Sequence, residues 1–176
     1  MKGGRRPIDR ITDEGYLDGL GELPADDLRG RREECEKEEA LLSYERRLLQ
    51  GRLDILKAEL ERRRTGEKGS LVDRLPQILA DSPRTSRGAF PKDVELPTFE
   101  NPRRRVEKLV SDDTLARLQS LGDGEIEELV ASLSSVEREV SDQRRAVQKV
   151  LDDINAEFVR RYQADPPDPA DVVRHS

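Results

Sequence analysis

The sequence has very few of the residues on which catalytic and metal sites depend. Its 176 residues include no tryptophan, a single cysteine (Cys35) and a single histidine (His175). One cysteine cannot form an internal disulfide, and one histidine near the end of the chain excludes Cys/His zinc sites and nucleophiles that need an imidazole base in mid-chain. We therefore predict no catalytic residues, no metal site and no enzymatic activity.

Large apolar side chains are also scarce. Hydrophobic residues make up 34% of the chain and aromatic residues 3%, whereas 40% of the residues are charged. This composition disfavours a thick globular core and favours an elongated all-α structure. No stretch approaches the roughly 18 apolar residues of a membrane span, and the first ten residues lack the apolar run of a secretory signal. We expect a cytoplasmic protein that has no contact with a membrane.

The charge balance disfavours direct binding to DNA. The chain carries 32 basic and 38 acidic residues, so its formal net charge is -6, and the two signs are interleaved along the sequence. A dedicated DNA-binding domain is usually basic, and single-strand binding usually needs aromatic side chains for stacking. The short arginine clusters fit solvated helix faces, although each of them is also able to meet an anion locally.

Glycine and proline divide the chain into five segments. Residues 1–23 contain five glycines, and residues 66–102 contain five prolines, whereas the segments that follow each of these are rich in Glu, Arg and Leu. We predict a flexible arm over 1–23, a long helix over 24–65, a proline-rich connection with short helices over 66–122, a second long helix over 123–163, and a disordered tail over 164–176. Within the connection, Ser111 and the two aspartates after it predict a helix cap.

The two predicted long helices are related by an internal repeat. When the chain is shifted by 98 residues, 11 of the 25 positions between 39 and 63 are identical, where about two identities are expected by chance. Because the matches include polar positions, the repeat indicates that both helices carry the same polar feature. The matched apolar positions form a stripe with heptad-like spacing on each helix: Leu42, Leu49, Leu53, Leu56 and Leu60 on the first, and Val140, Val147, Ile154 and Phe158 on the second.

This apolar stripe, which we call the seam, predicts how the two helices pair. An isolated helix exposes its seam to water, so the two helices should pack against each other. A chain that leaves the first helix near residue 65 and returns near residue 125 pairs most simply as an antiparallel coiled-coil hairpin. Cys35 lies seven residues before Leu42 and is predicted to continue the seam.

A polar row lies beside each seam, roughly 90° around the helix by helical geometry. Each row contains Glu, Ser, Arg, Gln and Asp at the same spacing. Guanidinium groups bind phosphates and stack on purines, and carboxylates accept hydrogen bonds from the Watson–Crick edge of guanine. In an antiparallel hairpin the two rows frame a twofold polar groove. Such a groove suits a twofold, doubly anionic ligand that contains guanine.

The spacing Glu-x3-Ser-x2-Arg-x3-Gln-x3-Asp, present twice, resembles the cyclic di-GMP motif of the RsiG-like anti-sigma factors of actinobacteria. The two copies comprise Glu39, Ser43, Arg46, Gln50 and Asp54, and Glu137, Ser141, Arg144, Gln148 and Asp152. The resemblance implies that these ten residues bind an intercalated dimer of cyclic di-GMP, as a ligand and not as a catalytic cofactor. It also implies that the nucleotide-bound protein sequesters WhiG, a sporulation sigma factor of RNA polymerase related to the flagellar-type sigma factors.

A second interpretation stays open from the residues alone. A nucleotide-independent coiled-coil adaptor, or a purely structural protein, would explain the seam and the charged flanks. It would leave the repeated Ser and Gln of the polar rows without a role. Binding of a protein partner that does not depend on nucleotide would favour the adaptor.

Overall fold

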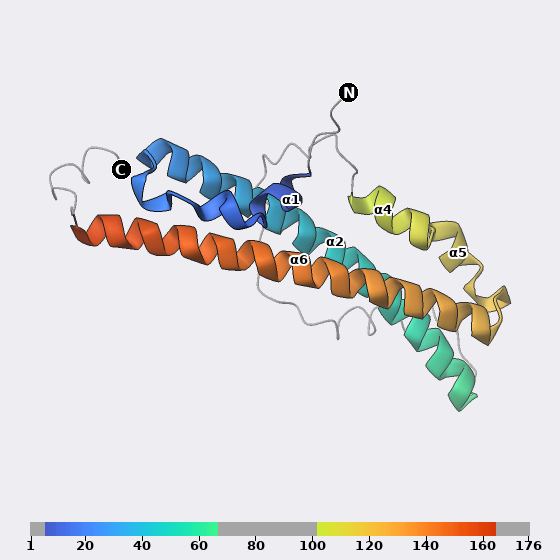
Figure 1. Cartoon of the computed structure of the whole chain (residues 1–176). Helices are drawn as coiled ribbons and strands as arrows, with labels where there is room; N and C mark the ends of the chain where they lie inside the picture. Colours follow the sequence, from blue (N-terminus) through green and yellow to red (C-terminus); the bar gives the residue numbers. More distant parts are fainter. Residues whose placement is uncertain (1–5, 67–101, 165–176) are drawn as a thin grey trace, which may run out of the picture. The chain divides into compact units, whose positions relative to one another are not determined.

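In the computed structural model, residues 6–66 and 102–164 are described, and every regular element among them is a helix (Figure 1). The expected all-α class is therefore confirmed. The elements are α1 (Pro7–Ile11), the 3₁₀ turns η1 (Glu14–Leu17) and η2 (Leu20–Glu22), α2 (Ala25–Thr65), α4 (Pro102–Leu109), α5 (Asp112–Ala116), η3 (Leu118–Ser120) and α6 (Asp123–Ala164). Most of the predicted proline-rich connection and the tail from residue 165 onward lie outside the described residues.

The two long helices begin and end where the sequence provides the matching signals. α2 has two aspartates in its first turn and three arginines in its last, which complement the helix dipole. It stops at Gly66, whose φ of 66° is a left-handed conformation that favours glycine. α6 begins after Gly122, whose backbone N–H donates to Glu125 Oε2 at 2.7 Å. These contacts satisfy backbone groups that the helix ends would otherwise leave exposed.

A strict heptad of buried residues runs along each long helix. The α2 members are at most 5% exposed and the α6 members are 0% exposed, which confirms the predicted seam and the burial of Cys35. The heptads are Leu28, Cys35, Leu42, Leu49 and Leu56 on α2, and Ile126, Leu133, Val140, Val147 and Ile154 on α6. The seam begins one heptad before the predicted Cys35 on α2 and two heptads before the predicted Val140 on α6. Leu60 and Phe158 at its far ends are only half-buried. The regular spacing is typical of coiled-coil packing.

The chain divides into two compact units, and both long helices contribute to each of them. The first unit comprises Met1–Ala40 and Gln143–Ser176, and the second comprises Leu41–Asp142. In terms of the 98-residue repeat, each unit combines the first part of one copy with the second part of the other. The two units are therefore built from corresponding parts of the repeat.

Within each unit the α2 segment runs antiparallel to the α6 segment. In the second unit, Arg46 contacts Glu137 while Arg63 contacts Asp123, so residue numbers rise on α2 as they fall on α6. The first unit has the same order: Arg32 stacks over the Phe158 ring and Glu39 pairs with Arg144. The antiparallel hairpin is confirmed, and the contact of Arg63 with Asp123 places the end of α2 near the start of α6, as the sequence predicts.

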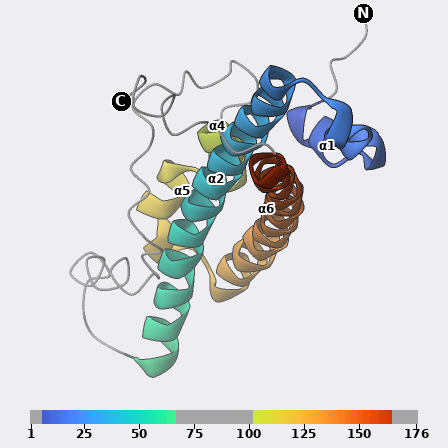
Figure 2. The same cartoon turned by 90° about the vertical axis from the view of Figure 1, so that its left-hand side faces the viewer.

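The expectation of a flexible arm over residues 1–23 is wrong for residues 7–22, which form α1, η1 and η2 beside the N-terminal part of α2 (Figure 2). Ile8, Ile11 and Tyr16 in this segment are buried. The Tyr16 hydroxyl donates to Glu34 Oε2 at 3.1 Å, and Arg31 on α2 lies 5.2 Å from the centre of the Tyr16 ring. Buried side chains and polar contacts with α2 therefore hold this glycine-rich stretch against the first unit.

Short helices occupy the matching place in the second unit. α4 and α5 are separated at Ser111, whose Oγ accepts a hydrogen bond of 3.1 Å from Thr114 N, so the predicted cap is confirmed. Arg52 on α2 donates to the Val110 carbonyl at 3.0 Å and to Asp112 Oδ1 at 2.9 Å. Val110 is itself buried. Apolar burial and arginine hydrogen bonds together hold these helices on the hairpin.

Candidate functional site

The polar motif and the short helices lie on opposite sides of the seam. At 100° per residue, the motif positions of α2 fall on one flank of the seam, and the residues that contact the short helices fall on the other. Glu45 is one of the latter, because Arg105 of α4 approaches its carboxylate at 3.4 Å. The contacts of Arg52 and Arg63 with the segment between α4 and α6 are on the same flank. The described short helices therefore pack on the flank that does not carry the motif.

In the second unit, three motif residues donate to one carboxylate oxygen of a fourth, Glu137. Glu137 Oε1 accepts hydrogen bonds from Arg46 Nε at 3.0 Å, from Gln50 Nε2 at 3.3 Å and from Ser141 Oγ at 3.0 Å. The Nε group of Arg46 also lies 3.0 Å from Ser141 Oγ. All four side chains are half-buried. We call this group the second-unit cluster.

The first unit contains the same arrangement, built from the other members of the two motif copies. Glu39 Oε1 accepts hydrogen bonds from Arg144 Nε at 3.0 Å and from Gln148 Nε2 at 3.2 Å. The exposed fractions of the Arg144 and Glu39 side chains are 29% and 24%, close to the 33% and 19% of Arg46 and Glu137. We call this group the first-unit cluster.

Each cluster combines residues from both motif copies. The glutamate comes from one copy, and the arginine and glutamine come from the other, 87 to 109 positions away in sequence. The structure thus brings together seven of the ten predicted site residues in two groups. Of the others, Ser43 and Asp54 are half-buried and Asp152 is exposed. The predicted groove that spans both rows stays a prediction.

The chemistry of each cluster suits a polar, anionic ligand. Hydrogen bonds between a guanidinium and a carboxylate are charge-assisted and stronger than neutral ones. In the second-unit cluster both hydrogen bonds of Arg46 are donated by Nε, so they do not use the two terminal amino groups of the guanidinium. Because the arginine is a third exposed, solvent screens its pairing with Glu137 only in part.

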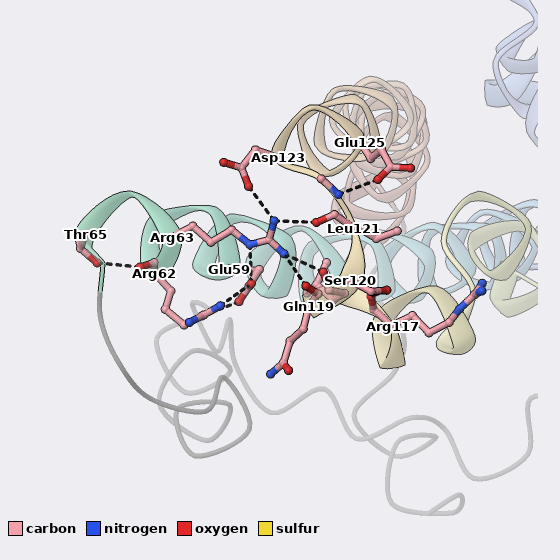
Figure 3. Close-up of polar contacts among 12 residues, drawn as sticks. Glu59, Arg62, Arg63, Thr65, Arg117, Gln119, Ser120, Leu121, Asp123 and Glu125 are labelled. Atoms are coloured by element: carbon pink, nitrogen blue, oxygen red, sulfur yellow. Dashed lines mark hydrogen bonds and ion pairs between the residues drawn. The ribbon is translucent and has the colours of Figure 1, made fainter.

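A second repeated device lies at the end of α2, and it is drawn in Figure 3. The Glu59 side chain is fully buried and accepts hydrogen bonds of 2.7 to 2.8 Å from Arg62 and Arg63. Arg63 also donates to the carbonyl oxygens of Leu118 at 2.9 Å and Leu121 at 2.8 Å. The hydrogen bonds from Arg62, and then those from Arg63, lower the pKa of Glu59 to about 2. This group ties α2 to the turn that precedes α6.

The first unit repeats this device with Glu157, Arg160 and Arg161. Both arginines donate to the Glu157 carboxylate at 2.7 Å, and Arg161 donates to the Leu20 carbonyl at 2.9 Å. Hydrogen bonds from Arg160 and Arg161 lower the pKa of Glu157 to about 2. The sequence presents Arg160 and Arg161 as a short arginine cluster that fits a solvated helix face or a local anion contact, and it does not predict their pairing with Glu157. Their signal was the repetition of one glutamate followed by two arginines at the same spacing.

Together, these features define a class: an internally duplicated two-helix hairpin with one polar cluster in each unit. Comparison with known families agrees, since residues 14–79 and 112–175 each match the RsiG-like family, the second match beginning 98 residues after the first. The two matches cover most of the chain, and the chain belongs to the RsiG-like family. This is a family of regulatory anti-sigma factors and not of enzymes, so the partner is a sigma factor.

No curated protein matches the chain. Over the residues that the structure describes, no helix combines the length and the apolar character needed to cross a membrane.

Proposed function

We propose that this anti-sigma factor binds cyclic di-GMP through its two clusters and, with nucleotide bound, sequesters a sigma factor of the WhiG or flagellar type. The observation that carries the proposal is the duplication of the cluster. The same hydrogen-bonded Glu, Arg and Gln occur in both units, with distances that agree within 0.1 Å. A flank used only for solubility has no need of the same neutral Gln at the same place twice.

The chemistry of the clusters supports the choice of ligand. Cyclic di-GMP has two guanines and two phosphates related by a twofold axis, and the protein offers two chemically equal clusters. Arginine binds phosphate with two parallel hydrogen bonds and stacks on purine faces. The aspartate that ends each motif copy can accept hydrogen bonds from the N1–H and amino group of guanine, which adenine does not present in this pattern. The motif therefore favours a guanine dinucleotide over an adenine one.

Calorimetric titration tests the nucleotide part of the proposal. We expect cyclic di-GMP to bind, and cyclic di-AMP and GTP to bind weakly or not at all. The double variant Arg46→Ala, Arg144→Ala should lose at least about 2 kcal/mol of binding free energy per arginine while its circular dichroism stays unchanged. The matched control is Arg47→Ala, Arg145→Ala, which removes the same charge from two exposed neighbours. Undiminished binding in the first variant would contradict the proposal.

The sigma factor part rests on thermodynamic linkage. A nucleotide that favours the complex raises the affinity for sigma by the same factor by which sigma raises the affinity for nucleotide. A coupling of about 3 kcal/mol would change the sigma affinity roughly 150-fold. The test is a titration against a flagellar-type sigma factor with and without cyclic di-GMP. Equal sigma affinity in both titrations would favour the nucleotide-independent adaptor.

A further inference from the structure

We propose that Glu137 is a positioning residue, which holds Arg46 of the opposite motif copy so that the terminal amino groups of Arg46 face the ligand. This inference rests on the proposed function and assigns different roles to residues of the same motif. A working half-site then consists of a glutamate from one copy and an arginine and a glutamine from the other. Each half-site therefore belongs to one structural unit and is not formed by a single motif copy along one helix.

The geometry of the second-unit cluster carries the argument. A guanidinium has one Nε–H and two terminal amino groups, and the hydrogen bonds of Arg46 to Glu137 and Ser141 are both donated by Nε. A carboxylate that was paired end-on with the terminal groups would compete with a phosphate for them. A carboxylate held at Nε fixes the plane of the guanidinium and leaves the terminal groups to form two parallel hydrogen bonds with an anion.

Glu137 is itself well placed for this role. Its Oε1 atom also accepts hydrogen bonds from Gln50 and Ser141, so the carboxylate is fixed by groups from both helices. Glu39 has the corresponding bonds to Arg144 and Gln148 in the first unit. A side chain that is only 19% exposed and anchored from several sides orients its neighbour more firmly than a mobile surface carboxylate does.

Double-mutant cycles on cyclic di-GMP affinity test directly whether Glu137 of one motif copy acts through Arg46 of the other. We expect Arg46→Ala and Glu137→Ala each to weaken binding about 30-fold, and the double variant to be no weaker than Arg46→Ala alone, because Glu137 acts through Arg46. The matched cycle within one motif copy, Glu39→Ala with Arg46→Ala, should show losses that multiply to about 900-fold. Multiplying losses in the crossed pair, or coupled losses in the same-copy pair, would overturn the proposal.

A conservative variant separates orientation from charge. Arg46→Lys keeps the positive charge but removes the guanidinium. A lysine ammonium has no Nε–H that Glu137 could hold while two parallel donors face a phosphate. We expect the affinity of Arg46→Lys to lie within about threefold of Arg46→Ala, whereas Glu137→Gln, which keeps an acceptor oxygen for Nε, should retain more affinity than Glu137→Ala. Binding of Arg46→Lys at the unmodified level would overturn the positioning role.

Thermal unfolding without nucleotide gives an independent readout of the same pair. The melting losses of Arg46→Ala and Glu137→Ala should be less than additive, because either change removes the same ion pair. Additive losses would overturn the proposal that Arg46 and Glu137 act as a pair. If the unmodified protein fails to bind cyclic di-GMP, the proposed function and the positioning role fall together. If it binds and only the crossed cycle is uncoupled, the positioning role alone is wrong.

Discussion

Arg161 donates a hydrogen bond of 2.9 Å from Nη2 to the carbonyl oxygen of Leu20. The second unit has the equivalent pair, in which Arg63 Nη2 donates to the Leu118 carbonyl at 2.9 Å. Arg63 corresponds to Arg161, and Leu118 to Leu20, by the 98-residue repeat. The internal repeat therefore extends beyond the polar motif to the turns that lead into both long helices. Side-chain identity at these turns is low, because the arginine binds backbone carbonyls, which every residue provides.

Replacement of Arg63 tests the importance of this device for stability. Arg63→Ala removes hydrogen bonds to three backbone carbonyls, to Asp123 and to the buried Glu59 carboxylate, and Arg62 alone then pairs with that charge. We expect a loss of about 2 kcal/mol or more in the free energy of unfolding, measured by chemical denaturation. Arg64→Ala, at the neighbouring exposed position, is the control and should cost less than about 0.5 kcal/mol. Similar losses in the two variants would contradict the assigned role.

The seam should dominate the stability of the hairpin. Val147 is fully buried, so Val147→Asp places a carboxylate in the apolar contact between the helices and should cost several kcal/mol, with a clear loss of helicity. Ala156→Asp adds the same charge to an exposed position of α6 and should have a small effect. Thermal melts followed by circular dichroism measure both variants. Equal losses would show that the seam does not hold the helices together.

Stability should fall in acid through Glu59 and Glu157. Their pKa values are lowered to about 2 in the folded protein from an ordinary value of 4.5, so the unfolded chain binds protons more readily. The stabilisation is complete above pH 4.5 and is lost as the pH falls from there toward 2. Glu59→Gln should lower the melting temperature at pH 7 and flatten this acid dependence, whereas the exposed Glu61→Gln should leave its slope unchanged. An unaltered slope in Glu59→Gln would disprove the assignment.

The aspartates of the motif should be needed for the response to nucleotide. If they contact guanine, as the proposed function requires, the double variant Asp54→Ala, Asp152→Ala should bind the sigma factor with the same affinity in the presence and absence of cyclic di-GMP. Asp153→Ala, an exposed neighbour, should respond like the unmodified protein. Titrations against the sigma factor measure both. A normal response in the double variant would remove the aspartates from the ligand site.

Much of the fold follows from local features of the sequence. The 3.5-residue spacing of apolar side chains predicts a paired seam because a helix brings such residues to one face, and Ser111 predicts a cap because its hydroxyl binds the next backbone N–H groups. The ten motif residues and their repetition are likewise visible in sequence, since helical geometry places positions three and four apart on one stripe. These are short-range relationships, which the chain encodes within a few turns.

Tertiary structure decided which of those residues meet. Sequence alone places Glu39 and Arg46 on the same stripe, but Glu39 pairs with Arg144 and Arg46 with Glu137, because antiparallel packing sets the register between residues about 100 positions apart. It also decided that the glycine-rich N-terminal segment is packed, because the burial of Tyr16 depends on Arg31 and Glu34 of α2. Local helix propensity does not depend on such long-range contacts. It therefore predicts the seam and the polar row of each helix but not the residues that they contact.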